Sequence, residues 1–345
     1  MSKKYKNLIY FQNGSIGDFL MTIFFLENVY LNDDSIKLYI VVPKNKVFLS
    51  QFLKKYSYIN LILANRKNIH GWLGIFSLFK FSFYKNLIIT VPTPGRLPLG
   101  IKIIAKLTAM HFKSLLAGSD DGQGINKLIY NKLYKYNKQI NYPEFLKSIL
   151  KILDFEIKKE NPILEHADES NILEQLKLEK NNYVVIHARA ATKGRSLDNQ
   201  CLRLLVNSII SIDGEMKILL TGSTSDRDFL SGFESEFKNV VLGINLSVVD
   251  LCGVIKKSKL FIGVDTGITH VASFLGKKSL VLAQSGTPNW LPYYNDQAII
   301  LYAINDCTYN IYSGQEYLQN CQKDDICRLG KIPFDVINQE LKKLL

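Results

Sequence analysis

The chain alternates short β-rich runs with helical patterns in two separate series, and this alternation constrains the fold more than any other feature. The strand-like runs of the first series are KNLIYFQ, IKLYIVVP, INLILA and NLIITVP. Those of the second are YVVIHA, KILLTG, NVVLGI, KLFIGV and SLVLA, with helical stretches such as LDNQCLRLLVNSIIS between them. Strand–helix alternation predicts parallel sheets with helices on both faces. We therefore expect an α/β fold with two doubly wound domains facing across a cleft.

A polar, charged stretch broken by Pro162 separates the two series and predicts a linker with a surface helix. We place the first domain at residues 1–160, the linker at 161–182, the second domain at 183–328 and a closing helix at 329–345. The 345 residues, 47% of them hydrophobic, are enough for two cores of ordinary size.

Targeting signals and cysteine usage indicate the compartment. No run reaches the roughly 20 uninterrupted apolar residues of a membrane span, and the N-terminus lacks the pattern of a signal peptide. Five scattered cysteines without a CxxC pair suit a reducing cytoplasm, where we expect the protein. An alternative for Cys307, Cys321 and Cys327 is that they clasp the C-terminal region through a bond or a metal.

The positive charge is concentrated in the first half. Residues 1–160 hold 24 Lys and Arg against 10 Asp and Glu, whereas residues 161–345 hold 19 against 21. A basic half attracts nucleic acid, an acidic membrane surface or a phosphorylated substrate. The lysines are dispersed and no zinc-finger or RNP-type motif is present, so nucleic acid is not expected as a partner.

The stretch 66–85 has apolar residues at helical spacing between basic flanks. One interpretation is a helix that rests on an anionic bilayer, giving peripheral contact with the cytoplasmic face of the inner membrane. The other is an ordinary helix packed on the first sheet.

The sequence NGSIGDFL at 13–20 interrupts two apolar runs and predicts a strand-to-helix turn. In one interpretation Asp18 simply caps the helix. In the other, Gly14, Ser15 and Gly17 form a turn that opens a cleft and aims the Asp18 carboxylate into it. The chain has neither a G-x-G-x-x-G turn followed by an acid nor a P-loop, so a dinucleotide cofactor and P-loop chemistry are disfavoured.

Two strand-end loops of the second series carry the residue types of a phosphate site, and ligands of open α/β sheets bind at such ends. The loop at 187–196 clusters Thr192 with the cations Lys193 and Arg195. In the loop at 264–270 a helix is expected to begin, and its N-terminus would offer free N–H groups to an anion. Its relevant residues are Asp265 at the strand end, Thr266 and Gly267 at the helix start, and His270 one turn inside.

Other polar positions have plain structural alternatives. Asp226 lies in the hydroxyl-rich turn at 221–228, where its D-x-D sequence suggests a metal–diphosphate ligand but equally a helix start. His270 alone fits a packed, hydrogen-bonded histidine equally well. No His, Cys and Asp cluster has metal-ligand spacing, so no metal is expected.

GSIGDFLMT near the start, GVDTGITHVASFLGKKSLVLAQSGTPNWLPY near the end and the Lys-bearing loop between them resemble the bacterial lipopolysaccharide heptosyltransferases, family nine of the glycosyltransferases, over nearly the whole length. The resemblance implies a GT-B fold in which the second domain binds the donor and the first binds the acceptor. It also implies inverting, metal-independent transfer from a nucleotide-diphosphate sugar, with ADP-linked heptose favoured. The acceptor would be a lipopolysaccharide or another anionic cell-surface glycan or glycolipid.

The resemblance also assigns roles to the residues of this chain that match the family's motifs. By this resemblance Asp18 is the general base. The expected donor contacts are Thr192, Lys193, Thr266 and Gly267 at the diphosphate, Asp226 at the ribose, and Asp265 and His270 elsewhere in the donor site.

The middle loop departs from the family pattern, because the usual Pro-Gly is missing and Arg195 stands about where a tryptophan is expected. LVLAQSGTP also replaces a more usual phenylalanine–glycine ending. These changes lie around the donor sugar, so a hexose or another nucleotide sugar is the alternative donor. A nucleotide-sugar epimerase and a non-catalytic binder are further alternatives; the basic first half argues against the former and the carboxylate at position 18 against the latter.

Overall fold

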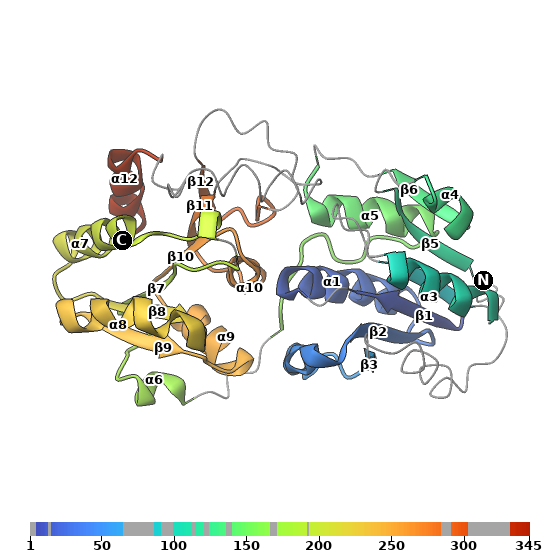
Figure 1. The fold of residues 1–345 in the computed structure, drawn as a ribbon, viewed down its shortest axis with the longest axis horizontal. Coiled ribbons are helices and arrows are strands. Elements are labelled where there is room, and N and C mark those ends of the chain that lie inside the picture. The colour runs from blue at the N-terminus through green and yellow to red at the C-terminus, as the bar shows by residue number, and fades with distance from the viewer. Residues whose placement is uncertain are drawn as a thin grey trace. The chain divides into compact units, whose positions relative to one another are not determined.

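The structure is a computed structural model that describes residues 5–12, 15–64, 86–90, 99–111, 115–120, 124–135, 140–165, 171–191, 193–283, 291–302 and 332–345. The chain divides into two compact units, which we call unit 1 (Met1–Pro162) and unit 2 (Ile163–Leu345). The described strands form one parallel six-stranded sheet in each unit (Figure 1).

Unit 1 has the strand order β3-β2-β1-β4-β5-β6. Its strands are β1 (Asn7–Phe11), β2 (Lys37–Pro43), β3 (Ile59–Ala64), β4 (Asn86–Thr90), β5 (Leu115–Asp120) and β6 (Lys132–Lys135). Its helices are α1 (Ile16–Asn32), η1 (Lys44–Leu53), α3 (Leu99–His111), α4 (Asn126–Ile129) and α5 (Tyr142–Ile152).

Unit 2 has the strand order β12-β11-β10-β7-β8-β9. Its strands are β7 (Tyr183–His187), β8 (Lys217–Gly222), β9 (Val240–Ile244), β10 (Leu260–Val264), β11 (Ser279–Ala283) and β12 (Ala298–Tyr302). Its helices are α6 (Ile172–Gln175), η2 (Lys193–Arg195), α7 (Asn199–Ile212), η3 (Thr224–Asp226), α8 (Arg227–Glu236), α9 (Val248–Lys257), α10 (Gly267–Phe274) and α12 (Phe334–Leu344).

The two sheets share one topology. In each, the first strand lies beside the fourth, and the chain winds outward from that pair in both directions. The pairs are β1 with β4 in unit 1 and β7 with β10 in unit 2. At such a point the connections leave toward opposite sides of the sheet, which opens a crevice at the carboxyl ends of the strands where ligands of α/β proteins bind. A ligand site is therefore expected at the loops that follow β1, β7 and β10.

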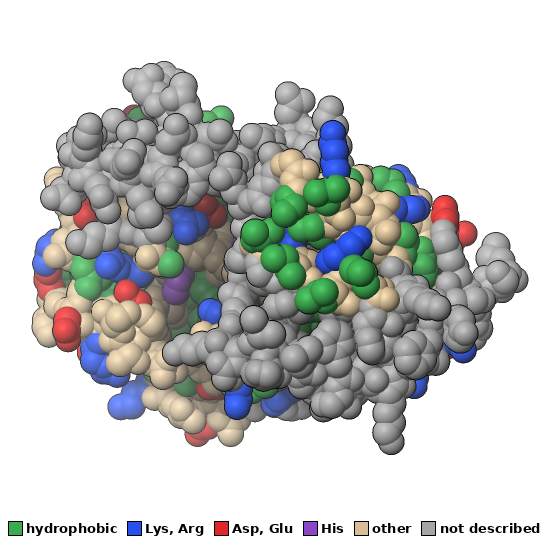
Figure 2. All heavy atoms as spheres, turned by 45° about the vertical axis from the view of Figure 1, so that its right-hand side comes forward, with side chains coloured by type: hydrophobic (Ala, Val, Ile, Leu, Met, Phe, Trp, Pro, Cys, Tyr) green, Lys and Arg blue, Asp and Glu red, His purple; other side chains and the backbone are tan. Residues whose placement is uncertain are grey.

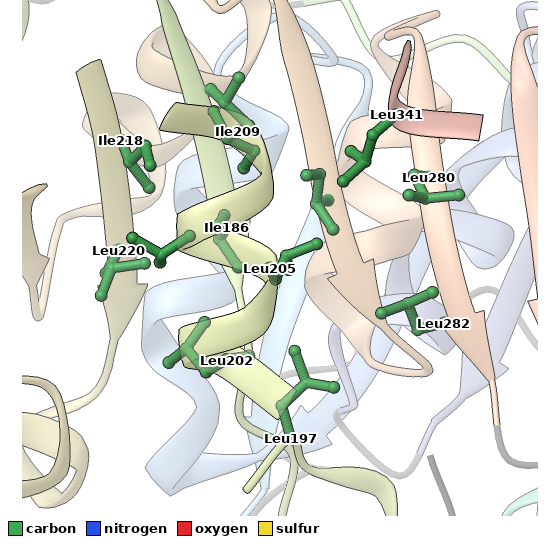
Figure 3. Close-up of a cluster of buried hydrophobic side chains, with 14 of the residues drawn as sticks. Ile186, Leu197, Leu202, Leu205, Ile209, Ile218, Leu220, Leu280, Leu282 and Leu341 are labelled. Atoms are coloured by element: carbon green, nitrogen blue, oxygen red, sulfur yellow. The ribbon is translucent and has the colours of Figure 1, made fainter. Parts of the chain in front are cut away.

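Continuous apolar runs explain the central strands, because a parallel sheet is covered on both faces. In unit 2, Leu202, Leu205 and Ile209 of α7 point toward the sheet, and Leu341 of α12 lies near Leu280 of β11 (Figure 3). All of these side chains are fully buried.

The opposite face of this sheet depends on Gly263 of β10. A Cβ at this position would lie 2.7 Å from the Oγ1 of Thr269 on α10 and 2.5 Å from the ring of Phe261. Glycine therefore allows α10 to approach β10 closely, at the strand whose end leads into the DTG turn.

The expected parallel α/β architecture is confirmed, and all nine strand-like runs form strands. Strands β5, β6 and β12 were not predicted from the sequence. The amphipathic stretch at 66–85 and the cysteines at 307, 321 and 327 lie outside the described residues.

The connector that leads to the unit boundary is held on α1. The side-chain oxygen of Asn28 accepts hydrogen bonds from the backbone N–H groups of Lys158 and Lys159, each at 2.9 Å. Asn32 donates to the Glu156 carbonyl at 2.7 Å and accepts from the Glu156 N–H at 2.9 Å. Residues 156–159 are thus fixed to the helix that begins at the GSIGD turn.

Candidate active site

The turn between β1 and α1 presents the carboxylate at position 18. Ser15 is the N-cap of α1: its Oγ accepts from the Asp18 N–H at 3.3 Å and donates to the Asp18 Oδ2 at 2.5 Å. The interpretation in which Asp18 caps the helix is therefore wrong: Ser15 holds the N-cap position, and Asp18 lies inside the first turn. Gly17 lies in the first turn, and Gly14 lies outside the described residues.

Only one oxygen of the Asp18 carboxylate is engaged by the cap. Within the described part of the chain, Oδ1 is buried without a hydrogen-bond partner. Burial raises the pKa of Asp18 to about 6, although the hydrogen bond from Ser15 opposes the rise. Such a carboxylate is ionised at neutral pH, yet it holds a proton far more readily than an exposed aspartate, as a general base requires.

The loop after β7 is closed at its base by hydrogen bonds. The Leu197 N–H donates to the Ala188 carbonyl at 2.9 Å, and the Ala190 N–H donates to the Ser196 Oγ at 3.0 Å. Of the two residues expected at its tip, Thr192 lies outside the described residues, and the backbone of Lys193 is described in η2 but its side chain is not.

Arg195 joins the two loops of the β7–β10 switch point. Its Nη1 donates to the Asp265 carbonyl at 3.3 Å and lies 3.5 Å from the Asp265 Oδ2. Both side chains are partly exposed, at 32% and 26%, so they lie at the surface of unit 2 and not in its core. The structure thus brings together two predicted donor-site residues that are 70 positions apart.

Asp226 is held by its own turn and by the β7 loop. Its Oδ2 accepts from the N–H and Oγ of Ser223 at 2.9 and 2.6 Å, and its Oδ1 lies 3.4 Å from the Arg189 Nε. Burial raises the pKa of Asp226, but the bonds from Ser223 and Arg189 outweigh it and leave this pKa below its ordinary value. Arg189 also stacks over the Phe229 ring at 4.5 Å. Asp226 therefore remains ionised, and its expected ribose contact stays a prediction.

The start of α10 is an uncapped helix N-terminus. Thr266 occupies the N-cap position with extended backbone, but its side chain makes no capping hydrogen bond. Among the described residues its Oγ1 is buried without a partner. The first N–H groups of a helix lack partners within the helix, so Gly267 and its successors present donors and a partial positive charge to an incoming anion.

His270 is buried one turn further along α10, with 7% exposure. Its Nδ1 lies 2.8 Å from the Tyr294 hydroxyl, and the two rings stack. The packed, hydrogen-bonded state that the sequence left open is present. The expected place of His270 in the donor site stays a prediction.

His187, the last residue of β7, was not predicted from the sequence as a site residue. Its Nδ1 lies 3.0 Å from the Thr221 Oγ1 of β8. Burial lowers the pKa of His187 to about 4, against the attraction of Asp226, so the ring is neutral at physiological pH. Its position at the carboxyl end of a switch-point strand was the signal that could have found it. Tyr294 had no such signal.

Among the described residues, no group of three or more His, Cys, Asp or Glu is arranged to hold a metal ion. In the same part of the chain, no helix combines the length and the apolar character needed to cross a bilayer.

One family model matches more than half of the chain. The model of glycosyltransferase family 9 (heptosyltransferase) matches residues 110–319. A comparison with curated proteins found no match. One similar solved structure is a family 9 glycosyltransferase from Veillonella parvula, with a TM-score of 0.79, 14% identity, and coverage of 100% of this chain and 98% of the other.

Two further similar structures are Escherichia coli enzymes. ADP-heptose lps heptosyltransferase II has a TM-score of 0.69 and 13% identity, and 98% of each chain is covered. Heptosyltransferase WaaC, solved with ADP, has a TM-score of 0.67 and 14% identity, with 92% of this chain and 100% of the other covered. The heptosyltransferase TibC, described as dodecameric and iron-containing, is similar at a TM-score of 0.58 and 11% identity, with 99% of this chain and 78% of the other covered.

The fold and these matches define a glycosyltransferase of the GT-B class. The chain belongs to glycosyltransferase family 9, the heptosyltransferase family, which confirms the resemblance seen in its motifs.

Proposed function

We propose that this enzyme transfers a sugar, with heptose favoured, from a nucleotide-diphosphate donor to a lipopolysaccharide or another cell-surface glycan. Asp18 is the general base, and the anomeric configuration inverts in a single displacement. The proposal rests foremost on the Asp18 carboxylate, whose buried Oδ1 has no hydrogen-bond partner among the described residues and whose pKa is raised to about 6.

In the proposed reaction, Asp18 takes the proton of the acceptor hydroxyl as the acceptor oxygen bonds to the anomeric carbon. The bond between that carbon and the donor phosphate oxygen breaks, and its electron pair leaves with the nucleoside diphosphate. General-base assistance of this kind contributes about 10²–10⁴-fold to the rate.

The leaving diphosphate needs compensation for its negative charge. In this proposal the N–H groups at the start of α10, Lys193 and the partly exposed Arg195 supply it. Preorganised donors and cations are sufficient for this role, so we expect transfer without a metal ion. Activity that survives treatment with EDTA and dialysis would support this expectation, and activity restored only by added metal would contradict it.

The donor nucleotide is expected to be ADP-linked. WaaC, which shares the fold, was solved with ADP, and TibC with ADP-D-beta-D-heptose. The altered loop around Arg195 keeps a hexose or another sugar as the alternative. Thermal-shift measurements with ADP, GDP, UDP and CMP and their sugars would distinguish the candidates.

Two variants test the roles. Asp18→Asn should lower kcat by about 10²–10⁴-fold while nucleotide affinity changes only a few-fold; turnover near that of the wild type would leave Asp18 no catalytic role. Lys193→Ala should weaken binding of the nucleoside diphosphate more than binding of the nucleoside. An equal loss for both ligands would refute the diphosphate contact.

The proposal also covers the compartment and the unit that binds the acceptor. The enzyme acts in the cytoplasm, where nucleotide sugars are available, and receives an anionic glycan or glycolipid on the basic unit 1.

A further inference from the structure

Helix α3 exposes a row of large aliphatic side chains. Among the residues of α3 whose side chains are described, those buried in unit 1 are Lys102, Ala105 and Ala109, exposed by 4% or less. The outward row, at helical spacing, is Leu99, Ile103, Leu107 and Met110, with exposed fractions of 46, 45, 52 and 64%. On the surface of a soluble domain the outward face of a helix is normally polar.

The neighbouring helix α4 buries Asn126 and Ile129 and exposes Leu128. Asn126 is fully buried and its Oδ1 accepts a hydrogen bond from the Lys102 ammonium at 2.7 Å, whereas Leu128 is 78% exposed. A buried lysine and asparagine thus pair beneath a surface of leucine, isoleucine and methionine. We call the surface formed by Leu99, Ile103, Leu107, Met110 and Leu128 the α3 face.

The charge around the α3 face has one sign. Neither α3 nor α4 contains an acid, and Lys106 and Lys127 lie on them with partly or fully exposed side chains. Over the longer segment 35–143, 17 Lys and Arg stand against two Asp and no Glu. Figure 2 shows hydrophobic side chains gathered to the right of centre with Lys and Arg side chains among them.

We propose that the α3 face docks on the surface of a phospholipid bilayer that contains anionic lipid. Exposed aliphatic side chains beside lysines are the composition of an interfacial helix, which buries its apolar row at the acyl boundary while its cations meet anionic headgroups. A nucleic acid would use the cations but leave the aliphatic row in water. A second copy of the chain would bring two basic surfaces together, which is unfavourable.

Docking at this face would also bring the proposed base near the membrane, an inference that rests on the proposed function. Helix α3 follows β4, and β4 lies beside β1, the strand that leads to Asp18. Helices α1 and α3 therefore both follow the carboxyl ends of neighbouring parallel strands, so the start of α3 and the proposed base lie at the same edge of one sheet. An acceptor anchored in the bilayer would reach unit 1 without leaving its membrane.

Vesicle flotation of the full-length protein tests the proposal. The vesicles are phosphatidylcholine alone or phosphatidylcholine mixed with phosphatidylglycerol. The wild type should float with the anionic vesicles, much less with the neutral ones, and less at high salt. The Leu107→Ser/Met110→Ser variant should bind anionic vesicles about tenfold more weakly, because two inserted side chains are lost. A Lys106→Glu/Lys127→Glu variant should also bind more weakly and lose much of the dependence on salt.

The matched control is Leu31→Ser/Leu204→Ser, which changes two leucines of comparable exposure away from the α3 face and should float like the wild type. Each variant should fold, because the substituted side chains are partly or fully exposed. Thermal unfolding verifies this. Equal flotation of the wild type and the α3-face variant would overturn the proposal, as would failure of the wild type to bind anionic vesicles. A variant that changes from dimer to monomer in sedimentation while vesicle binding stays unchanged would assign the face to a second copy. Nucleotide affinity should be the same in every variant, so failure here is distinguishable from failure of the proposed function.

Discussion

Replacing Asp18 with asparagine is expected to stabilise unit 1 at neutral pH while it removes most of the transfer activity. The reason is the buried carboxylate, which the folded protein keeps ionised at a cost. Its pKa is raised to about 6 from an ordinary value of 3.8. At about 1.36 kcal/mol for each pH unit, this difference corresponds to a destabilisation of at most about 3 kcal/mol when the group is ionised.

The sign follows from proton binding. Between about pH 4 and pH 6 the folded protein holds the Asp18 proton more tightly than the unfolded chain does, so stability falls as the pH rises through this window. Above it, the wild type carries the full penalty. The asparagine variant has no charge to bury and can still accept the hydrogen bond from the Ser15 hydroxyl.

Thermal unfolding of both proteins at neutral pH and near pH 4 measures the effect. One kcal/mol shifts the melting temperature of a domain of this size by about 2–4 °C, so the variant should melt up to roughly 6–12 °C higher at neutral pH. The difference should nearly vanish near pH 4, where both side chains are neutral. Asp228→Asn, which removes an exposed acid from the first turn of α8, is the matched control and should not stabilise. A variant that melts lower than the wild type, or a gap that is the same at both pH values, would refute the reasoning.

Three further expectations concern the pH profile set by Asp18, the connector bound by Asn28 and the close packing at Gly263. Below pH 6, kcat/KM of the wild type should fall about tenfold per pH unit as Asp18 is protonated; Ser15→Ala removes the hydrogen bond that lowers this pKa and should move the inflection upward, and a flat profile down to pH 5 would exclude Asp18 as the base. Asn28→Ala leaves the N–H groups of Lys158 and Lys159 without their acceptor and should cost about 2–4 kcal/mol in denaturant unfolding, with a smaller loss for the more exposed Asn32→Ala. Gly263→Ala forces a Cβ against Thr269 and should cost about 1–3 kcal/mol; an unchanged unfolding midpoint would show that α10 does not depend on this close approach.

The sequence was sufficient for the strands at the centre of each sheet, because these are buried on both faces and read as continuous apolar runs. It was insufficient for β5 and β6, whose sequences LLAGSD and KLYK mix apolar with polar or charged residues. Lysines on the edge strand β6 are the kind of residue that protects a sheet edge from pairing with another chain. The run AIILY of β12 has strand character, but no helical pattern separates it from β11.

The same distinction applies to the site. Strand-end position identified the loops after β1, β7 and β10, because the rule for open sheets depends only on topology. It did not identify partners distant in the sequence, such as Arg195 with Asp265 or His270 with Tyr294. The cap at Ser15 was also missed, since Ser15 and Asp18 are both good capping residues and only the backbone geometry distinguishes them. The exposed aliphatic row of α3 depends on which face of the helix meets the sheet, which periodicity alone does not show.

A crystal structure of the enzyme with a bound nucleoside diphosphate would examine the proposed site most directly. The pyrophosphate is expected within hydrogen-bonding distance of the N–H groups at Gly267 and Ile268, with the Lys193 ammonium beside it. A pyrophosphate bound at the β1–α1 turn next to Asp18, or anywhere remote from the start of α10, would contradict the assignment of base and donor site.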